Sequence, residues 1–284
     1  MGKVGTYLSF VRVSHTVFAL PFALTGALLA WRVHPFTWAQ LAWIVAAMVA
    51  ARSAAMGFNR LVDARFDALN PRTANREIPR GAMSAREATA FVLVSAAVFI
   101  AVAFRLSPVC GWLAPVALGI VFWYSLAKRY TTYTQLFLGL AMAVAPVGGW
   151  LAAGGAWGWE PWILALAIGL WVGGFDILYA CQDVEFDRAQ GLRSMPTRYG
   201  VAGAIRLSRL MHVATIVAMA VLQPVAGLPP AYFGGVVAVA ALLVYEQSLV
   251  SADDLSQVKR AFDLNGWVGI VYFLSTAGAL WIAG

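Results

Sequence analysis

Long apolar runs alternate with short polar segments along the chain. An α-helix needs about 20 mostly apolar residues to cross a bilayer, and each run is close to that length. No linker or water-soluble segment interrupts the series, so we expect a single all-α membrane domain over residues 1–284. The nine predicted transmembrane helices are 14–31, 38–60, 86–105, 109–127, 134–153, 161–181, 207–226, 230–249 and 264–283.

The amino-acid composition supports a membrane protein and excludes two other classes. Hydrophobic residues make up 61% and charged residues 12% of the chain, whereas soluble proteins have roughly 45–50% apolar and about 25% charged residues. So few charges cannot cover the surface of a water-soluble enzyme, and disordered chains are polar and poor in aromatic residues. Cys110 and Cys181 lie in apolar segments, which gives neither a disulfide framework nor a zinc-binding spacing.

The basic residues predict the orientation of the chain. If the N-terminus is cytoplasmic, all but three of the 20 Lys and Arg residues lie on the cytoplasmic side. Arg32 and Arg105 lie outside, and Arg52 falls within the second span. This bias follows the positive-inside rule and predicts a multi-pass bacterial inner-membrane protein with a cytoplasmic N-terminus. The net charge of +7 is thus a topology signal, and we expect no nucleic-acid partner.

A first acidic stripe lies at the inner end of the second span. It consists of Asn59, Asp63 and Asp67, spaced at i, i+4 and i+8. At 100° per residue these positions drift by only 40° per step, so all three side chains project from one face of a helix.

A second acidic stripe lies at the inner end of the sixth span. It consists of Asp176, Asp183 and Asp187, at i, i+7 and i+11, which also places them on one face of a continuous helix. Both stripes contain Asp-x-x-Phe-Asp, beginning at Asp63 and at Asp183. A single five-residue match is weak evidence for an internal repeat.

Two interpretations of the acidic stripes compete. Any single Asp there is most simply an acid paired with one of the abundant arginines. Two stripes of matched spacing at one membrane depth favour a divalent-cation site, because ionisable groups near hydrocarbon are costly. Magnesium binds one or two carboxylates and completes its octahedron with waters and substrate phosphates.

Basic residues near the stripes supply the complementary charge. Arg72 and Arg76 follow the first stripe, while Tyr124 and Lys128 lie at the inner end of the fourth span. Guanidinium and ammonium groups bind phosphate oxygens. The positive-inside rule alone would place arginines in these loops, so Tyr124 and Lys128, expected on a helix end, carry more weight. Together with the acids they predict metal–diphosphate chemistry on a lipid-borne substrate.

At these motifs the sequence resembles the UbiA superfamily of intramembrane prenyltransferases. The first family signature matches Asn59-x-x-x-Asp63-x-x-x-Asp67 with the following Arg-Thr-Ala-Asn-Arg, and the second matches Tyr179-Ala-Cys-Gln-Asp183-Val-Glu-Phe-Asp187. The resemblance covers essentially the whole chain and implies nine helices around a central cavity. Many members have Asn-Asp at the first motif where this chain has Asn59-Arg60, a difference that we expect to separate subgroups.

The resemblance implies transfer of a polyprenyl group from polyprenyl diphosphate to an aromatic acid. The implied Mg²⁺ ligands, which are also catalytic, are Asp63, Asp67, Asp183 and Asp187. The implied diphosphate-binding residues are Asn59, Arg72, Arg76, Tyr124, Lys128 and Arg12. Asp176 is a further catalytic candidate, and the implied acceptor-binding residues are Arg52, Asp176 and Tyr179.

Arg52 bears on the identity of the acceptor. It lies two helical turns before Asn59 on the same face of the second span, and an arginine inside a span is a functional candidate. It either pairs with an acid such as Asp176 or binds the acceptor's carboxylate, as the hydroxybenzoate branch of the family suggests. His15 and His212 are interpreted as interfacial residues.

Several functions stay open on the sequence. We expect 4-hydroxybenzoate as the acceptor, in ubiquinone biosynthesis. A hydroxynaphthoate in menaquinone biosynthesis, including the futalosine-type route, is the alternative with the same chemistry. A cation-coupled transporter is the alternative from another class, but it would need ionisable groups near the midplane and usually repeated halves.

Overall fold

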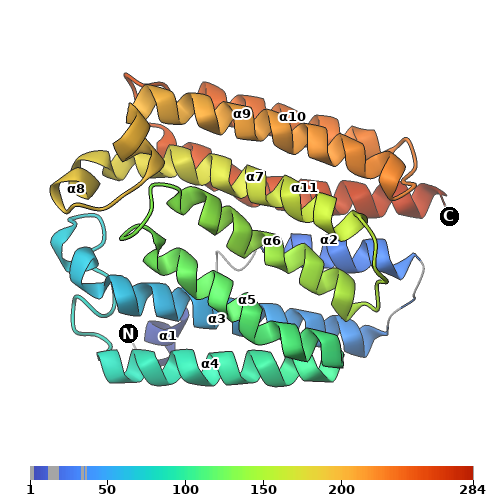
Figure 1. The fold of residues 1–284 in the computed structure, drawn as a ribbon, viewed down its shortest axis with the longest axis horizontal. Helices are drawn as coiled ribbons and strands as arrows, with labels where there is room; N and C mark the ends of the chain where they lie inside the picture. The colour runs from blue at the N-terminus through green and yellow to red at the C-terminus, as the bar shows by residue number, and fades with distance from the viewer. Residues whose placement is uncertain (1–2, 12–18, 33–34, 36, 284) are drawn as a thin grey trace. The chain divides into compact units, whose positions relative to one another are not determined.

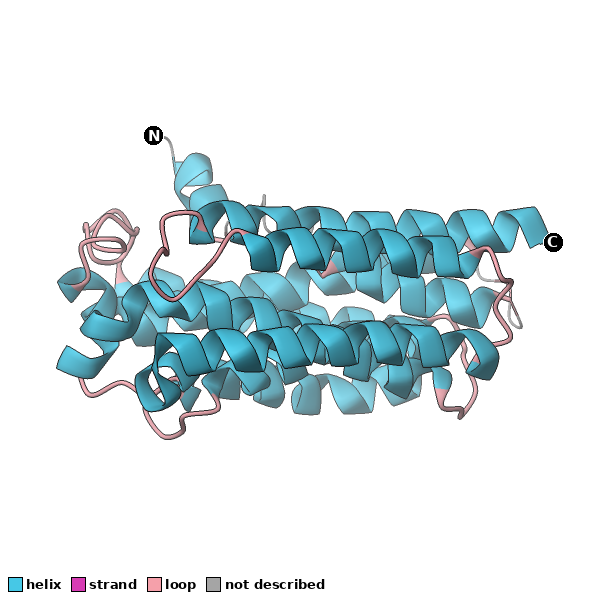
Figure 2. Cartoon of the chain, turned by 90° about the horizontal axis from the view of Figure 1, so that it is seen from above, coloured by secondary structure: helices cyan, strands magenta, loops and turns pink. Residues whose placement is uncertain are grey.

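Helices and the loops between them make up the computed structural model, which describes residues 3–11, 19–32, 35 and 37–283 (Figures 1 and 2). No strand occurs among these described residues. Seven helices are long and apolar enough to cross a membrane, and α2 (Leu20–Trp31) and α10 (Tyr232–Ser248) are shorter apolar helices. The all-α prediction is confirmed, and the protein is an integral multi-pass membrane protein.

Each of the nine predicted spans coincides with a helix in the described part of the chain. The predictions for α4 (Ala85–Leu106), α5 (Pro108–Ala127) and α6 (Thr134–Ala152) are right to within a residue or two. The first span was predicted to begin at residue 14, whereas α2 begins at Leu20; residues 12–18 lie outside the described ranges.

Three helices continue well beyond their predicted apolar runs. They are α3 (Trp38–Leu69), α9 (Met195–Val225) and α11 (Val258–Ala283). Hydropathy marks only the part of a helix that lies in hydrocarbon, whereas backbone hydrogen bonding continues through polar residues until the chain is interrupted. In α3 the helix stops at Leu69, directly before Asn70 and Pro71. In α9 the backbone kinks at Gly200, where φ is +70°.

The chain forms two compact units. Unit 1 comprises residues 1–17 and 37–126, and unit 2 comprises residues 18–36 and 127–284. The prediction of a single domain over residues 1–284 stays a prediction.

In unit 1, α3 packs along α4, and the short helix α1 (Lys3–Phe10) contacts α3. Phe10 lies in a buried cluster with Met83 and Ala88. A Cβ atom on Gly57 of α3 would lie 2.8 Å from the side chain of Val92. This glycine therefore allows the close packing of the helices beside the first acidic stripe.

In unit 2, α7 (Glu160–Ala180) packs against both α6 and α9. Helix α2 packs against α6 at backbone distance, since a Cβ on Gly26 would lie 2.1 Å from the carbonyl oxygen of Pro146. Small residues commonly allow this close approach between membrane helices.

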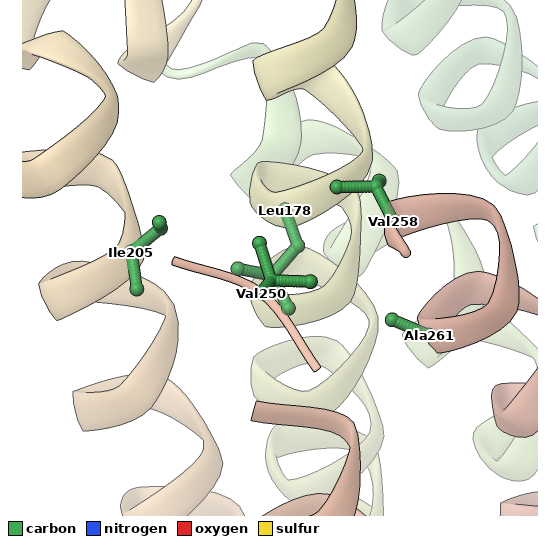
Figure 3. Close-up of a cluster of buried hydrophobic side chains, with 5 residues drawn as sticks. All are labelled: Leu178, Ile205, Val250, Val258 and Ala261. Carbon is green, nitrogen blue, oxygen red and sulfur yellow. The ribbon is translucent and has the colours of Figure 1, made fainter. Parts of the chain in front are cut away.

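The C-terminal end of α7 is fixed by an apolar cluster in unit 2. Figure 3 shows Leu178 of α7 with side chains from α9, the α10–α11 connection and α11. The members of the cluster are Leu178, Ile205, Val250, Val258 and Ala261. This packing holds the segment from which the second acidic stripe continues.

Buried polar contacts also join the helices of unit 2. The indole nitrogen of Trp171 donates to Asn265 (2.7 Å), whose amide donates to Glu246 of α10 (2.9 Å). His212 is buried, within hydrogen-bond distance of Gln247 and of the Trp171 carbonyl. The ring of His212 is therefore part of this helix packing, and its interpretation as an interfacial residue stays a prediction. His15 lies outside the described residues.

Candidate active site

The first acidic stripe lies on the uninterrupted C-terminal part of α3, with the α-helical period that the sequence predicted. Asp63 and Asp67 are 3% and 6% exposed. The side-chain amide of Asn59 donates to Asp63 and to Ser125 of α5, both at 3.4 Å. The amide thus links the stripe to a second helix of unit 1 and orients the first carboxylate.

The loop after α3 folds back onto Asp67. The Nη1 atom of Arg76 lies 2.8 Å from both carboxylate oxygens of Asp67, and the Thr73 hydroxyl donates to the Asp67 carbonyl oxygen. The buried Nε of Arg76 has no hydrogen-bond partner among the described residues. Asp67 is therefore paired with an arginine, and that arginine keeps donor capacity for a further acceptor.

The other candidates for diphosphate binding lie on turns and helix ends. The Arg72 backbone N–H donates to the Asn70 side chain (2.9 Å), which forms a turn that leaves Arg72 exposed. Tyr124 lies near the end of α5 in unit 1, half-buried. Lys128 was expected on the same helix end, but α5 ends at Ala127, so Lys128 begins the following turn and belongs to unit 2.

The second acidic stripe does not lie on one continuous α-helix, so this prediction was wrong. Helix α7 ends at Ala180, a 3₁₀ turn η2 covers Cys181–Asp183, and α8 covers Val184–Ala189. A 3₁₀ turn advances about 120° per residue rather than 100°. The three aspartates thus come from three successive elements. All three are more exposed than Asp63 and Asp67.

Side chains near the 3₁₀ turn satisfy the carbonyl groups at the end of α7. The Cys181 thiol donates to the Ile177 carbonyl (3.3 Å), and the Gln182 amide donates to the Tyr179 carbonyl (3.2 Å). The ring of Tyr179 packs on Phe262 of α11, with ring centroids 4.5 Å apart. Tyr179 is therefore held in an aromatic cluster within one turn of Asp176.

The loop after the second stripe is tied to the segment that carries Lys128. The Arg193 backbone N–H donates to the Lys128 carbonyl, and its guanidinium donates to the Tyr130 carbonyl, both at 2.8 Å. The buried Gln135 side chain accepts from the Met195 N–H (3.1 Å). Unit 2 therefore brings Lys128 and the loop of the second stripe together. The sequence did not predict these contacts of Arg193 and Gln135, since contacts to backbone groups leave no residue pattern.

Arg52 lies on α3, deeper than the first stripe. Its Nε is buried and has no hydrogen-bond partner among the described residues. A buried guanidinium donor without an acceptor is costly, so this position suits an anionic ligand. Arg12 falls outside the described residues.

The described residues contain no group of three or more His, Cys, Asp and Glu side chains that could hold a metal ion. Each stripe by itself supplies two of the predicted magnesium ligands, Asp63 with Asp67 in unit 1 and Asp183 with Asp187 in unit 2. The predicted four-carboxylate set stays a prediction, as does the central cavity.

Comparison with known proteins identifies the family to which this fold and these motifs belong. The sequence model of the UbiA prenyltransferase family matches residues 19–276. The chain belongs to the UbiA prenyltransferase family. This membership confirms the resemblance drawn from the motifs and identifies the protein as a prenyltransferase.

Individual relatives agree with this membership. The chain is 30% identical over 239 residues to a 4-hydroxybenzoate octaprenyltransferase from Citrobacter koseri, covering 83% of this chain and 82% of that protein. The apo structure of a UbiA homolog from Aeropyrum pernix K1 has a TM-score of 0.86 at 34% identity, covering 96% of this chain and 98% of the other. A UbiA homolog from Archaeoglobus fulgidus bound to GPP and Mg²⁺ shares the fold, with a TM-score of 0.70 at 18% identity over 96% and 99% of the two chains.

Proposed function

We propose that this protein transfers a polyprenyl group from polyprenyl diphosphate to 4-hydroxybenzoate, with Mg²⁺, in ubiquinone biosynthesis. The observation that carries the proposal is the presence of two acidic stripes, each followed by a loop with basic side chains. The identity to 4-hydroxybenzoate octaprenyltransferases supports the choice of acceptor.

The donor set of the stripes suits magnesium. Asp63 and Asp67 are one turn apart on α3, and carboxylate oxygens are ligands that Mg²⁺ accepts alongside water and phosphate. Each Asp67 oxygen that accepts from Arg76 keeps another lone pair. Asp63, Asp67, Asp183 and Asp187 would hold the metal, which when bound would neutralise the diphosphate and make it a better leaving group.

Basic and polar side chains of this chain would bind the diphosphate. Arg76 is already oriented by Asp67, so it loses little freedom on binding phosphate. Donors fixed in advance stabilise the charge that develops as the allylic C–O bond breaks. The full set that we assign to diphosphate binding is Asn59, Arg72, Arg76, Tyr124, Lys128 and Arg12.

The acceptor would be held by its carboxylate and its phenol. Arg52 offers a buried guanidinium nitrogen without a partner in the described structure, which suits a carboxylate. Asp176 would accept a hydrogen bond from the phenol hydroxyl. This bond would raise the electron density of the ring carbon ortho to that hydroxyl. Tyr179, held against Phe262, would contact the ring. Exclusion of water prevents capture of the allylic cation as an alcohol.

Membership in a prenyltransferase family argues against the transporter alternative. The hydroxynaphthoate alternative rested partly on the presence of Asn59-Arg60 where many family members have Asn-Asp. Arg60 pairs with Glu77, so this sequence difference does not directly support a naphthoate acceptor. We assign the N-terminus and the active site to the cytoplasmic side of the inner membrane, because the loops beside both stripes carry most of the basic residues.

The test is a prenylation assay on membranes that contain this protein. We expect 4-hydroxybenzoate to be prenylated by an allylic diphosphate in the presence of Mg²⁺ and not in EDTA. A parallel reaction with a dihydroxynaphthoate separates the two acceptors. Faster turnover of the naphthoate would reassign the pathway, and product formed equally in EDTA would overturn the metal-dependent mechanism.

A further inference from the structure

A buried ion pair in unit 1 lies outside the groups assigned to catalysis. The guanidinium of Arg60, on α3, donates to Glu77 in the loop that follows the helix. Both side chains are 5% exposed. Burying two charges is costly unless further hydrogen bonds satisfy them, so the position of the pair calls for an explanation.

The pair joins three separate segments of unit 1. The Ser9 hydroxyl of α1 donates to the other carboxylate oxygen of Glu77 (2.5 Å). The Glu77 backbone carbonyl accepts from the N–H groups of Ala82 and Met83 (2.9 and 3.1 Å). Glu77 thus connects α1, the C-terminal part of α3 and the later residues of its own loop.

The same loop carries two of the proposed diphosphate-binding residues. It runs from Asn70 to Ser84, between α3 and α4, and contains Arg72 and Arg76. Arg76 precedes Glu77 directly, so one side chain engages Asp67 and the next engages Arg60. These two neighbouring residues of the loop thus each form an ion pair with α3. Together the ion pairs fix the backbone of the loop at residues 76 and 77.

We propose that Arg60, Glu77 and Ser9 are positioning residues that hold the loop in the conformation in which Arg72 and Arg76 bind the diphosphate. The inference rests on the proposed function, because it assumes that these arginines bind the substrate. It also gives Arg60 a role: this residue acts through Glu77 on the loop rather than on the substrate.

Kinetics of four variants test the inference. Glu77→Gln and Arg60→Met should raise KM for the prenyl diphosphate about tenfold or more, since small displacements of binding groups are expensive. KM for the aromatic acceptor should stay within about twofold, because its proposed contacts lie elsewhere. The double exchange Arg60→Glu with Glu77→Arg should recover most of the loss. Arg86→Gln, an exposed cation at the start of α4, is the matched control and should behave as wild type.

Trypsin cleavage of the solubilised protein gives a readout that needs no activity. Cleavage after Arg72 and Arg80, whose neighbouring residues are the same in every variant, should be faster in Glu77→Gln than in wild type. It should return toward wild type in the double exchange, where cleavage at the new site at position 77 is counted separately. Unchanged cleavage, or equal rises in both KM values, would overturn the inference. A wild-type protein that consumes no prenyl diphosphate would overturn the proposed function instead.

Discussion

The two acidic stripes share the pattern Asp-x-x-Phe-Asp but not their local structure. In the first stripe, α3 runs unbroken past Asp67, and its carboxylates are buried. In the second, α7 gives way to a 3₁₀ turn at Asp183, and the carboxylates are more exposed. Identical spacing therefore does not require identical presentation of the side chains.

The loops that follow the stripes are held by different forces. Ion pairs of Asp67 with Arg76 and of Glu77 with Arg60 hold the first loop. Hydrogen bonds to backbone carbonyls, including the two that Arg193 makes, help to hold the second. Loss of a carboxylate in the first region therefore removes a structural contact together with a candidate metal ligand.

The largest expected effect tests whether both stripes are catalytic. Asp63→Asn and Asp183→Asn should each lower kcat by about a hundredfold to a thousandfold, the loss typical when a group stabilising developing charge is removed. Single-turnover prenylation at saturating Mg²⁺ measures this loss. Asp253→Asn, an exposed acid in the α10–α11 loop, is the control. Wild-type turnover in either stripe variant would remove that stripe from the site.

The helices could be predicted from the sequence because an apolar run of membrane-spanning length has few alternatives. The face shared by Asn59, Asp63 and Asp67 was also predicted, since α3 keeps its α-helical period through the stripe. The break after Ala180 was not, because no Pro or Gly marks it and the side chains of Cys181 and Gln182 stabilise it locally.

The contacts between residues far apart in the chain could not be predicted from the sequence either. The pairing of Arg60 with Glu77 joins residues 17 positions apart across a loop, and several other arginines lie within the same span of sequence. The contact of Arg193 with Tyr130 ends on a backbone carbonyl, which every residue type possesses. Such partners depend on the folded loops and not on residue type.

The second prediction tests the structural ion pair of the first stripe. Asp67→Asn should lower activity and also the thermal unfolding temperature in detergent, whereas Asp253→Asn, at an exposed acid of the α10–α11 loop, should change neither. Asp67→Asn leaves the partly buried Arg76 without its charged partner, a loss of about 1–3 kcal/mol. An unchanged unfolding temperature in Asp67→Asn would show that its ion pair with Arg76 does not stabilise the fold.

The third prediction assigns the acceptor to one region. Arg52→Ala should raise KM for 4-hydroxybenzoate about tenfold, the effect of one lost charge-assisted hydrogen bond, and leave KM for the diphosphate unchanged. Arg52→Lys keeps the charge without the guanidinium fork and should lie between. A larger effect on the diphosphate would move Arg52 into the first stripe's binding set.

The smallest expected effect concerns acid sensitivity of the two loops. Burial alone would raise the pKa of Glu77, but hydrogen bonds from Ser9 and its own backbone, with the charges of Arg60 and Arg80, outweigh it and lower the pKa below 4.5. A carboxyl group with a lowered pKa in the folded protein stabilises it above its unfolded pKa, and this stabilisation is lost as the pH falls through the folded value. The first loop should therefore loosen below about pH 4.5.

Hydrogen exchange measures this loosening, after correction for the intrinsic pH dependence of exchange. The amides of Ala82 and Met83, which donate to Glu77, should lose protection a few-fold on acidification, and Glu77→Gln should abolish that response. The Arg193 amide also donates to a backbone carbonyl, that of Lys128 rather than of Glu77, and should keep its protection over the same range. If both loops loosened together, the carboxylate pairs would not be what distinguishes them, and the contrast between the two regions would reduce to the geometry of their helices.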